Sequence, residues 1–428
     1  MTRPTVCVLG VGFVGLTLAI SLNEVGFSVL AWEKNEEVSA NLANGITHIS
    51  EPNLQNKLQI HSDNKNFRVI SEASEAVEAT TFIITVGTPL NGGKVNLHAI
   101  QQAIHQILPA LKDSDLVIIR STTAIGTCRD VVLPLLEETG KNIHLAMCPE
   151  RTVEGQALQE MASLPQIIGA LNEESFEAAK SLFDVLGPEI VRVSSLESAE
   201  LAKLVNNTYR DLMFGFANEI ADIASAYKIS AQEVIEAANH NYGRSNIALP
   251  GISGGPCLEK DPWILVESGE KRGKKMSISR ASRIINEDTI DNFLNTYLNE
   301  TMMFEKIALL GLAFKGKPET KDLRGSAVYP VHQRLYAHFP HSVFSGYEPA
   351  GIDRLELPAF SLAKSLAEAV SEADLVILLT NSESFSQSPH EIARFANGHA
   401  LILDFWGRKF ETDFLNTQTY ISWSGGVK

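Results

Sequence analysis

The chain has 428 residues, which is more than one ordinary domain accommodates and suggests two or three domains. Its composition, 44% hydrophobic and 20% charged, is typical of compact globular proteins. The formal net charge of -15 argues against nucleic-acid binding, although a few local lysines and arginines can still hold a small anionic ligand. No apolar run reaches the ~18 to 20 residues of a membrane span, and the N-terminal apolar stretch is too short for a signal peptide. We therefore expect a soluble, cytoplasmic protein with neither a nucleic-acid nor a membrane partner.

The first part of the chain alternates short apolar segments with helical patterns. Strands are predicted at residues 5–9, 28–32, 81–86, 115–120 and 143–148. Helices are predicted between them, at residues 14–25, 96–110 and 128–137. Alternation of this kind builds an α/β fold with a doubly wound parallel sheet.

The pattern becomes helical at about residue 196. A long helix is predicted to about residue 227, another at 231–238, and more after the glycine-rich segment 250–255, to about residue 300. Alternation then returns, with strands at 306–310, 342–347, 375–379 and 400–405 and helices at 327–339 and 362–372. We predict two Rossmann-like doubly wound domains, residues 1–195 and 301–428, joined by a central helical region, residues 196–300.

A glycine motif, Gly10-Val11-Gly12-Phe13-Val14-Gly15, lies between the first strand and the first helix. Its glycines permit a tight turn and close approach to a pyrophosphate, which the helix N-terminus then binds. Glu33 follows the second strand at the usual spacing, where a carboxylate accepts the ribose hydroxyl and repels a 2′-phosphate. The pair favours NAD over NADP, although Lys34 weakens that preference. Turn glycines beside an unrelated surface acid are the alternative.

The last part of the chain repeats some of these features. Val6-Cys7-Val8-Leu9-Gly10 resembles Ile307-Ala308-Leu309-Leu310-Gly311, and Glu348, like Glu33, follows a second strand. The C-terminal loop, Gly311 to Gly316, lacks the middle glycine and contains Lys315. We interpret it as a phosphate-handling loop for another ligand.

Four cysteines are spread far apart, which predicts neither a metal site nor a redox pair. Cys257 follows three glycines and precedes Asp261-Pro262, which is typical of a helix start, and Lys260 is close in sequence. A helix N-terminus and a lysine both stabilise a thiolate, so Cys257 is a candidate nucleophile. A small buried hydrophobe is the alternative for Cys257 and the preferred interpretation of the other three cysteines.

The predicted helix from residue 196 carries a polar stripe. Lys203 and Asn207 are four residues apart and share a face, and Glu200, Arg210 and Asn218 lie near the same line. By itself such a stripe is more often a solvated face. A lysine–asparagine pair can also hold an oxyanion, which makes it a candidate site.

Polar residues follow three predicted strands of the first domain. They are Val86-Gly87-Thr88, Ser121-Thr122-Thr123 and the acids Glu150 and Glu154. The carboxyl edge of a parallel sheet is where ligands bind, so these ends are candidates for ligand contacts. Ordinary turn chemistry is the alternative.

Together these segments resemble the UDP-glucose/GDP-mannose dehydrogenase family across nearly the whole chain. The resemblance includes the glycine motif, residues 121–127, 149–155, 200–207 and 254–261, Gly311-Leu312-Ala313-Phe314-Lys315 and Asp322-Leu323-Arg324. It implies an N-terminal NAD domain, a central dimerising region and a C-terminal domain that binds a UDP-sugar. It also implies a homodimer or larger assembly in which the neighbouring subunit donates Arg244.

The resemblance implies a four-electron oxidation of a sugar's C6 alcohol, through the aldehyde and a cysteine thioester, to the carboxylate of a uronic acid. Cys257 would be the nucleophile, Lys203 and Asn207 would stabilise the oxyanion, and Asp261 would orient a water or act as base. Glu150 would assist thioester hydrolysis and Thr122 would hold the water. The implied products belong to polysaccharide biosynthesis.

The predicted cofactor contacts are Gly10, Gly12, Phe13, Val14, Gly15, Glu33, Lys34, Val86, Gly87, Thr88, Ser121 and Thr122. The predicted substrate contacts are Glu150, Arg151, Glu154, Lys203, Asn207, Arg210, Arg244, Gly254, Lys260, Lys315 and Arg324. The sequence mixes features of the branches that act on UDP-N-acetylmannosamine and on UDP-glucose, so the sugar stays open.

Two other functions are compatible with parts of the sequence. A two-electron hydroxyacid dehydrogenase shares a Rossmann domain and a helix with lysine and asparagine, but has no use for Cys257 or a second Rossmann-like domain. A non-catalytic nucleotide-sensing relative is the other, because a fold does not fix a function. The set Lys203, Asn207, Cys257 and Asp261 argues against it.

Overall fold

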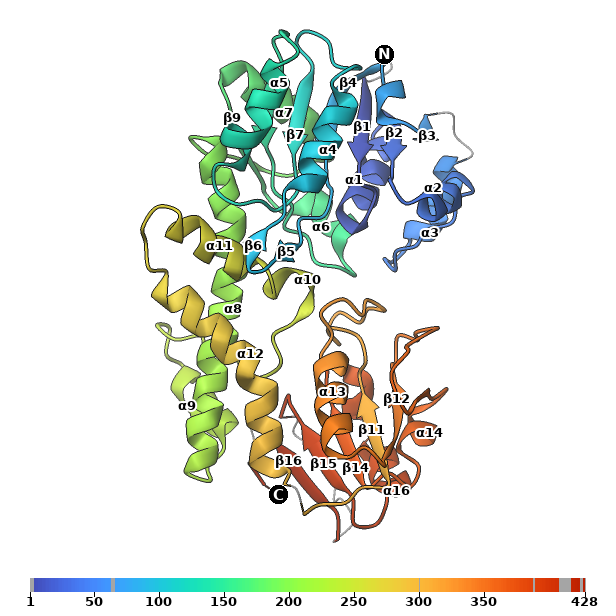
Figure 1. The fold of residues 1–428 in the computed structure, drawn as a ribbon, viewed down its shortest axis with the longest axis vertical. Helices are drawn as coiled ribbons and strands as arrows, with labels where there is room; N and C mark the ends of the chain where they lie inside the picture. The colour runs from blue at the N-terminus through green and yellow to red at the C-terminus, as the bar shows by residue number, and fades with distance from the viewer. Residues whose placement is uncertain are drawn as a thin grey trace. The chain divides into compact units, whose positions relative to one another are not determined.

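The computed structural model describes residues 4–62, 66–299, 301–387, 389–407, 417–423 and 426–427. The chain divides into two compact units. The first unit contains Met1–Asn206 and Trp263–Lys275, and the second contains Asn207–Pro262 and Met276–Lys428. Figure 1 shows each unit built around a sheet with helices on both faces.

The first unit is built on an eight-stranded sheet with the order β10-β9-β8-β7-β4-β1-β2-β3. The strands are β1 (Thr5–Leu9), β2 (Ser28–Trp32), β3 (Phe67–Ile70), β4 (Ala79–Ile84), β7 (Leu116–Ile119), β8 (His144–Met147), β9 (Gln166–Ala170) and β10 (Ile190–Arg192). All neighbours are parallel except β8 and β9, which are antiparallel. A small hairpin, β5 (Leu90–Asn91) and β6 (Lys94–Val95), lies outside this sheet.

Alternating side chains of β1 enter two separate cores. Val6 and Val8 belong to one core and Cys7 and Leu9 to the other, as the two-residue period of a strand requires. The helices of this unit before α8 are α1 (Phe13–Glu24), α2 (Glu36–Ala43), α3 (Leu54–Ser62), α4 (His98–Ile107), α5 (Leu133–Glu137), α6 (Ala157–Ser163) and α7 (Glu173–Phe183). Helices α1 and α7 pack into the first core and α4 into the second.

The second unit contains a seven-stranded sheet with the order β13-β12-β11-β14-β15-β16-β17. The strands are β11 (Lys306–Leu310), β12 (Val343–Tyr347), β13 (Phe360–Leu362), β14 (Leu375–Leu378), β15 (Leu401–Asp404), β16 (Thr419–Ser422) and β17 (Gly426–Val427). Only the pair β16–β17 is antiparallel among these described strands. Its helices are α13 (Val328–His338), α14 (Leu366–Val370), α15 (Glu383–Gln387) and α16 (Pro389–Phe395).

The central helices are α8 (Leu196–Ala226), α9 (Ala231–Asn239), α10 (Gly255–Leu258), α11 (Asp261–Glu270) and α12 (Ser277–Tyr297). Together with the two sheets they confirm the predicted fold class. Side-chain caps fix several helix starts, because Asn35, Asn172, Ser230 and Ser365 each accept a backbone N–H of the first turn. None of the described helices is long and apolar enough to cross a membrane.

Two predicted helices differ from the structure. The stretch 128–137 begins as a wide π-type turn over Cys128–Val132 and becomes α-helical only at Leu133. The stretch predicted as a helix from 362 to 372 begins with the end of strand β13, and the helix covers only Leu366–Val370. Ser365 is the reason for this start, because its side chain caps the helix at Glu368.

Candidate active site

The glycine motif forms the turn between β1 and α1. A methyl group built at Gly15 would lie 2.1 Å from the carbonyl oxygen of Gly10, so this glycine lets the helix pack against the turn. A methyl group built at Gly12 would have no atom within 4 Å, which leaves the turn open to a ligand. Both observations fit a bound pyrophosphate.

A cavity of about 540 Å³ opens beside this turn, and Glu33 lies in its wall. The carboxylate of Glu33 accepts the N–H groups of Val11 at 3.1 Å and of Asn35 at 3.1 Å. Predicted residues that line the cavity are Gly10, Gly12, Glu33, Lys34, Val86 and Gly87. The cavity is also lined by Ala99, Gln102 and Gln106 of α4, which no motif in the sequence indicated.

Ser121 and Thr88 hold neighbouring strand ends together. The Ser121 hydroxyl donates to the carbonyl of Val86 at 2.7 Å, and the Thr88 hydroxyl donates to that of Thr122 at 2.6 Å. Both side chains are buried, whereas Thr122 is half-buried. The hydroxyls of Ser121 and Thr88 therefore fix the edge of the sheet from which Thr122 projects.

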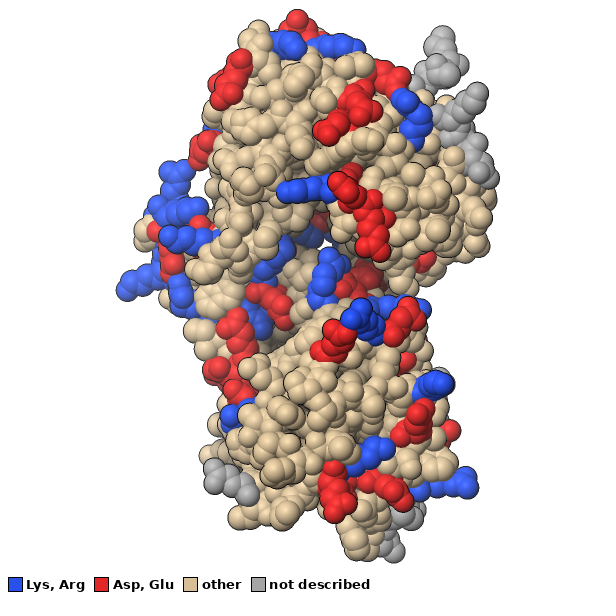
Figure 2. All heavy atoms as spheres, turned by 45° about the vertical axis from the view of Figure 1, so that its right-hand side comes forward, with Lys and Arg blue, Asp and Glu red and all other residues tan. Residues whose placement is uncertain are grey.

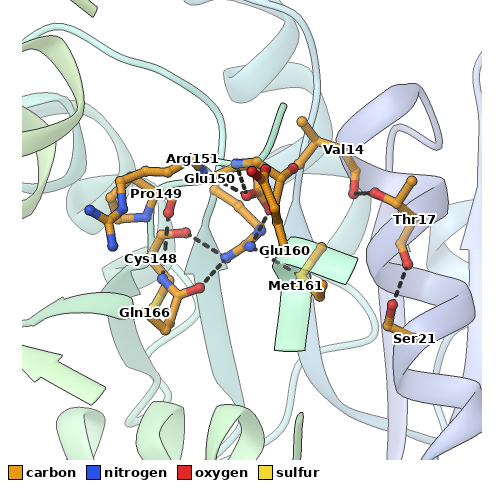
Figure 3. Close-up of polar contacts among 12 residues, drawn as sticks. Val14, Thr17, Ser21, Cys148, Pro149, Glu150, Arg151, Glu160, Met161 and Gln166 are labelled. Atoms are coloured by element: carbon orange, nitrogen blue, oxygen red, sulfur yellow. Dashed lines mark hydrogen bonds and ion pairs between the residues drawn. The ribbon is translucent and has the colours of Figure 1, made fainter. Parts of the chain in front are cut away.

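Glu150 lies in a buried ion pair that the sequence analysis did not predict. Its carboxylate pairs with the guanidinium of Arg120 and accepts the N–H groups of Arg151 and Thr152 at 2.6 and 2.7 Å. The same guanidinium donates to the carbonyl of Cys148 at 3.0 Å and to the side chain of Gln166 at 2.8 Å (Figure 3). Arg120 thus fixes both ends of the segment that contains Glu150.

The surroundings keep Glu150 ionised. Burial alone would raise the pKa of its carboxyl group, but the Arg120 guanidinium and two backbone N–H groups outweigh burial and hold the pKa below its usual value. Glu150 is therefore an ionised hydrogen-bond acceptor at neutral pH. The only hint of Arg120 in the sequence is a basic residue directly after four apolar strand residues.

The polar stripe of α8 is buried over part of its length. Glu200, Asn207 and Asn218 are buried, Lys203 is half-buried and Arg210 is exposed, whereas the apolar Leu201 and Phe216 are 38% and 48% exposed. The polar side chains are buried because they bind loops. Glu200 accepts the N–H groups of Gly126 and Cys128 at 2.6 and 2.8 Å.

Cys257 differs from the other cysteines. All four lie in the described residues, and Cys257 alone is exposed. Burial raises the pKa of Cys7 and of Cys148 to about 12, and burial also raises the pKa of Cys128. Cys257 is thus an accessible thiol on α10, and the alternative of a buried hydrophobe is wrong for it.

Three predicted site residues form a cluster around a buried carboxylate, and two of them, Lys260 and Asp261, lie close to Cys257 in sequence. Asn207 on α8 donates to the carboxylate of Asp261 at 2.6 Å, and the Lys260 ammonium donates to the same carboxylate at 2.8 Å. Asp261 is fully buried and the Lys260 side chain is 23% exposed, so both contacts are largely shielded from water. The remaining predicted catalytic residues, Lys203, Thr122 and Glu150, lie in the first unit.

Residues 254–255, just before Cys257, pack against the C-terminal loop that contains Arg324. The N–H of Gly255 donates to the carbonyl of Gly325 at 3.0 Å. Gly255 has a φ of +90°, and a methyl group there would lie 2.4 Å from the Phe314 ring. A methyl group at Gly254 would lie 2.7 Å from the Gly325 carbonyl, so close packing explains both glycines, against a backbone carbonyl at Gly254 and an aromatic ring at Gly255.

The C-terminal sheet repeats the glutamate contact of the NAD domain. Glu348, after β12, accepts the N–H groups of Ala313 at 2.9 Å and Ala350 at 3.1 Å, as Glu33 accepts those of Val11 and Asn35. Burial raises the pKa of Glu348 although these N–H groups oppose the shift. The similarity between the two sequence segments therefore corresponds to the same contact in both domains, in which a glutamate after the second strand accepts a backbone N–H from the loop after the first.

The other predicted substrate contacts differ in exposure. Lys315 is half-buried beside the Phe314 ring, and Arg324 is exposed and paired with Asp322. Arg210 and Arg244 are exposed, and the Arg244 guanidinium lies 4.9 Å from the Tyr242 ring centroid.

Two further predicted contacts lie after β8. Arg151 is half-buried and donates to the carbonyl of Pro165, and Glu154 is half-buried.

On the face drawn in Figure 2, acidic and basic side chains are interspersed.

Comparison with known proteins gives a match over most of the chain. Residues 4–186 match the NAD binding domain of the UDP-glucose/GDP-mannose dehydrogenase family, residues 197–288 its central domain and residues 308–408 its UDP binding domain. The chain is 31% identical over 390 residues to a UDP-N-acetyl-D-mannosamine dehydrogenase from Methanococcus maripaludis, covering 89% of this chain and 86% of that protein. It is 28% identical to an NDP-N-acetyl-D-galactosaminuronic acid dehydrogenase from Ralstonia nicotianae, covering 89% and 91%.

A solved structure gives the same result for the fold. The UDP-D-ManNAc dehydrogenase from Pyrococcus horikoshii is similar with a TM-score of 0.86 and 28% identity, over 98% of this chain and 99% of that chain. The three domain matches and the extent of the pairwise similarity confirm the resemblance and the predicted NAD cofactor. The chain belongs to the UDP-glucose/GDP-mannose dehydrogenase family.

Proposed function

We propose that this chain oxidises the C6 alcohol of a UDP-N-acetylhexosamine to the uronic acid in a four-electron, NAD-dependent reaction. The observation that carries the proposal is the accessible Cys257 in the same unit as the buried Asn207–Asp261–Lys260 cluster. We assign NAD to residues 1–195, the nucleophile to residues 196–300 and the nucleotide-sugar to residues 301–428. The domain matches support this assignment.

The chemistry requires a nucleophile between its two oxidations. NAD, when bound, accepts a hydride from the substrate carbon. An aldehyde is a poor hydride donor until addition makes it tetrahedral, and the Cys257 thiolate supplies that addition. A second hydride transfer then converts the thiohemiacetal to a thioester, with Lys203 and Asn207 stabilising the oxyanions.

Hydrolysis of the thioester requires a positioned water and a proton acceptor. We assign the water to Thr122 and Asp261, and the proton acceptor to Glu150. Arg120 keeps the Glu150 carboxylate ionised, as a proton acceptor must be, although the lowered pKa makes it a weaker base than an ordinary glutamate. The Cys257 thiolate leaves, and the carboxylate product is released.

The relatives narrow the choice of sugar. The similar proteins from Methanococcus maripaludis and Pyrococcus horikoshii are named for UDP-N-acetylmannosamine, and the one from Ralstonia nicotianae for an N-acetylgalactosamine derivative. The sugars in all three names carry an N-acetyl group. We therefore place UDP-N-acetylmannosamine first and UDP-glucose second.

NADH release over a panel of UDP-, GDP- and dTDP-sugars and of hydroxyacids tests the proposal. We expect the fastest release with a UDP-N-acetylhexosamine and little with the GDP- and dTDP-sugars. Release with hydroxyacids but with no nucleotide sugar would instead favour a two-electron dehydrogenase. The absence of release with every compound would favour a nucleotide-sensing protein.

The active form is proposed to be a homodimer in which Arg244 reaches the partner's substrate. Support comes from α8, where Tyr209, Phe216 and Ile223 recur every seven residues and are 60%, 48% and 55% exposed. A helix face with that spacing is apolar enough to pack against a second copy. A guanidinium is also suited to clamping an anionic substrate.

Subunit exchange tests the shared site. Homodimers of Arg244→Ala and of Cys257→Ala should each be nearly inactive. After mixing, heterodimers should regain part of the activity, because one of their sites contains both residues. A mixture that exchanges subunits yet stays inactive would place both residues in the same subunit's site.

A further inference from the structure

Arg283 on α12 is a buried cation in the unit that contains Cys257. Only 2% of its surface is exposed, and its guanidinium lies 2.5 Å from a carboxylate oxygen of Asp211, which is fully buried on α8. The two residues are far apart in sequence, so α8 and α12 are joined by a charged contact inside the protein. A buried charge requires such a partner, because its desolvation is costly.

The same guanidinium binds both ends of the segment around Cys257. It donates to the carbonyl of Leu258, the residue after Cys257, at 3.1 Å, and to that of Ser253 at 3.4 Å. The Ser253 hydroxyl in turn donates to Asp211 at 3.2 Å. Arg283 and Asp211 therefore hold Ser253 and Leu258 in place, and Cys257 lies between these two residues in the sequence.

Helix α8 anchors the segment on either side of these contacts. Asn218 exchanges two hydrogen bonds with the backbone of Gly251, at 2.9 and 3.1 Å. Asn207, one helical turn before Asp211, binds Asp261 at 2.6 Å. The backbone is thus tied down before and after Cys257, while the Cys257 side chain stays exposed.

Stability alone is a poor explanation for this arrangement. A buried ion pair often contributes no more to folding than apolar side chains of similar volume, because desolvation offsets the attraction. A guanidinium does what an apolar side chain cannot, since its fork of donors binds a carboxylate and two carbonyl groups in one fixed geometry. Arg283 makes contacts of this kind with Asp211, Leu258 and Ser253.

We propose that Asp211 and Arg283 are positioning residues for Cys257, which hold its thiol where it attacks the aldehyde. The inference rests on the proposed role of Cys257 as nucleophile. A catalytic nucleophile that is displaced by ~1 Å reacts much more slowly with its substrate. Loosening this segment should therefore affect aldehyde capture more than binding of the nucleotide-sugar.

The test is the double variant Asp211→Asn/Arg283→Met, which removes both charges but keeps a side-chain oxygen as acceptor for Ser253. We expect its Tm to stay near that of the wild type, because neither buried charge of the pair is left alone and Glu287, which also pairs with Arg283, is 49% exposed to water. We expect kcat for acid formation to fall about tenfold or more, KM for the nucleotide-sugar to change less than about threefold, and free aldehyde to appear. The matched control is Asp291→Asn/Arg334→Met, which removes a surface ion pair between α12 and α13.

A second measurement needs no substrate. Iodoacetamide should alkylate Cys257 in preference to the three buried cysteines. The rate of Cys257 alkylation in the double variant should differ from the wild-type rate by about threefold or more. This rate depends on the environment of the thiol and on its accessibility. If the double variant does not fold, Arg283→Lys, which keeps the charge but not the fork, replaces it in both measurements.

The outcomes separate the inference from the proposed function. A folded variant with wild-type kcat, no aldehyde and unchanged alkylation would overturn the positioning role. A wild-type protein that oxidises no nucleotide-sugar would overturn the proposed function, while a changed alkylation rate would still support the positioning of Cys257.

Discussion

Cys257→Ala is expected to abolish formation of the uronic acid. Without the thiol the aldehyde forms no covalent adduct, so the second hydride transfer has no tetrahedral donor. We expect acid formation to fall by about a thousandfold or more, as for loss of other catalytic nucleophiles. The measurement is acid release from the preferred UDP-sugar, followed by chromatography.

Binding is the control for this variant. Cys257 is an exposed side chain on a short helix, so its truncation should leave the affinities for NAD and the nucleotide-sugar nearly unchanged. Cys257→Ser is the companion variant, and it should accumulate an ester because an alkoxide leaves less readily than a thiolate. Wild-type acid formation by Cys257→Ala would exclude the thioester mechanism.

Arg120→Met is expected to destabilise the protein and to impair thioester hydrolysis. It leaves the buried Glu150 carboxylate without its cation, a change that typically costs about 3 to 5 kcal/mol. The matched control is Arg192→Met, which removes the exposed pair with Glu173 and should have little effect. Denaturant unfolding of both variants measures the difference.

The pH dependence of this loss has a defined sign. Because the folded-state pKa of Glu150 lies below its usual value, its pairing stabilises the protein above the unfolded pKa, and this contribution disappears as pH falls through the folded pKa. The stability difference between the wild type and Arg120→Met should therefore be largest at neutral pH and shrink in acid. A difference that is constant from neutral to acidic pH would contradict an ionised, paired Glu150.

The strongly apolar parts of the fold could be predicted from the sequence. The bounds of β1, β2 and β11 agree to the residue, because each ends in four consecutive apolar residues followed by a glycine or an acid. Strands β9 and β10 were missed, since Gly169 interrupts the apolar run of β9 and β10 has only two apolar residues before Arg192. The solvated alternative for the α8 stripe is wrong for Glu200, Asn207 and Asn218, whose partners are distant in sequence, but agrees with the exposed Arg210.

The supporting contacts of the site could not be predicted for a related reason. Arg283 binds a carboxylate 72 residues away in sequence, and Arg120 binds one 30 residues away. A single arginine in a helix or after a strand carries no local sign of such a partner. Asn207 and Cys257 were found because their spacing and neighbours repeat a family pattern, whereas the residues that hold them are specified only by packing.

The ratio of NADH to sugar tests the proposed reaction most directly. With limiting UDP-N-acetylmannosamine, or the best sugar of the panel, and excess NAD, the reaction is run to completion and both products are quantified. A cysteine adduct permits a second hydride transfer, so we expect about two NADH and one carboxylate per sugar. About one NADH per sugar, with free aldehyde as the end product, would contradict the four-electron reaction.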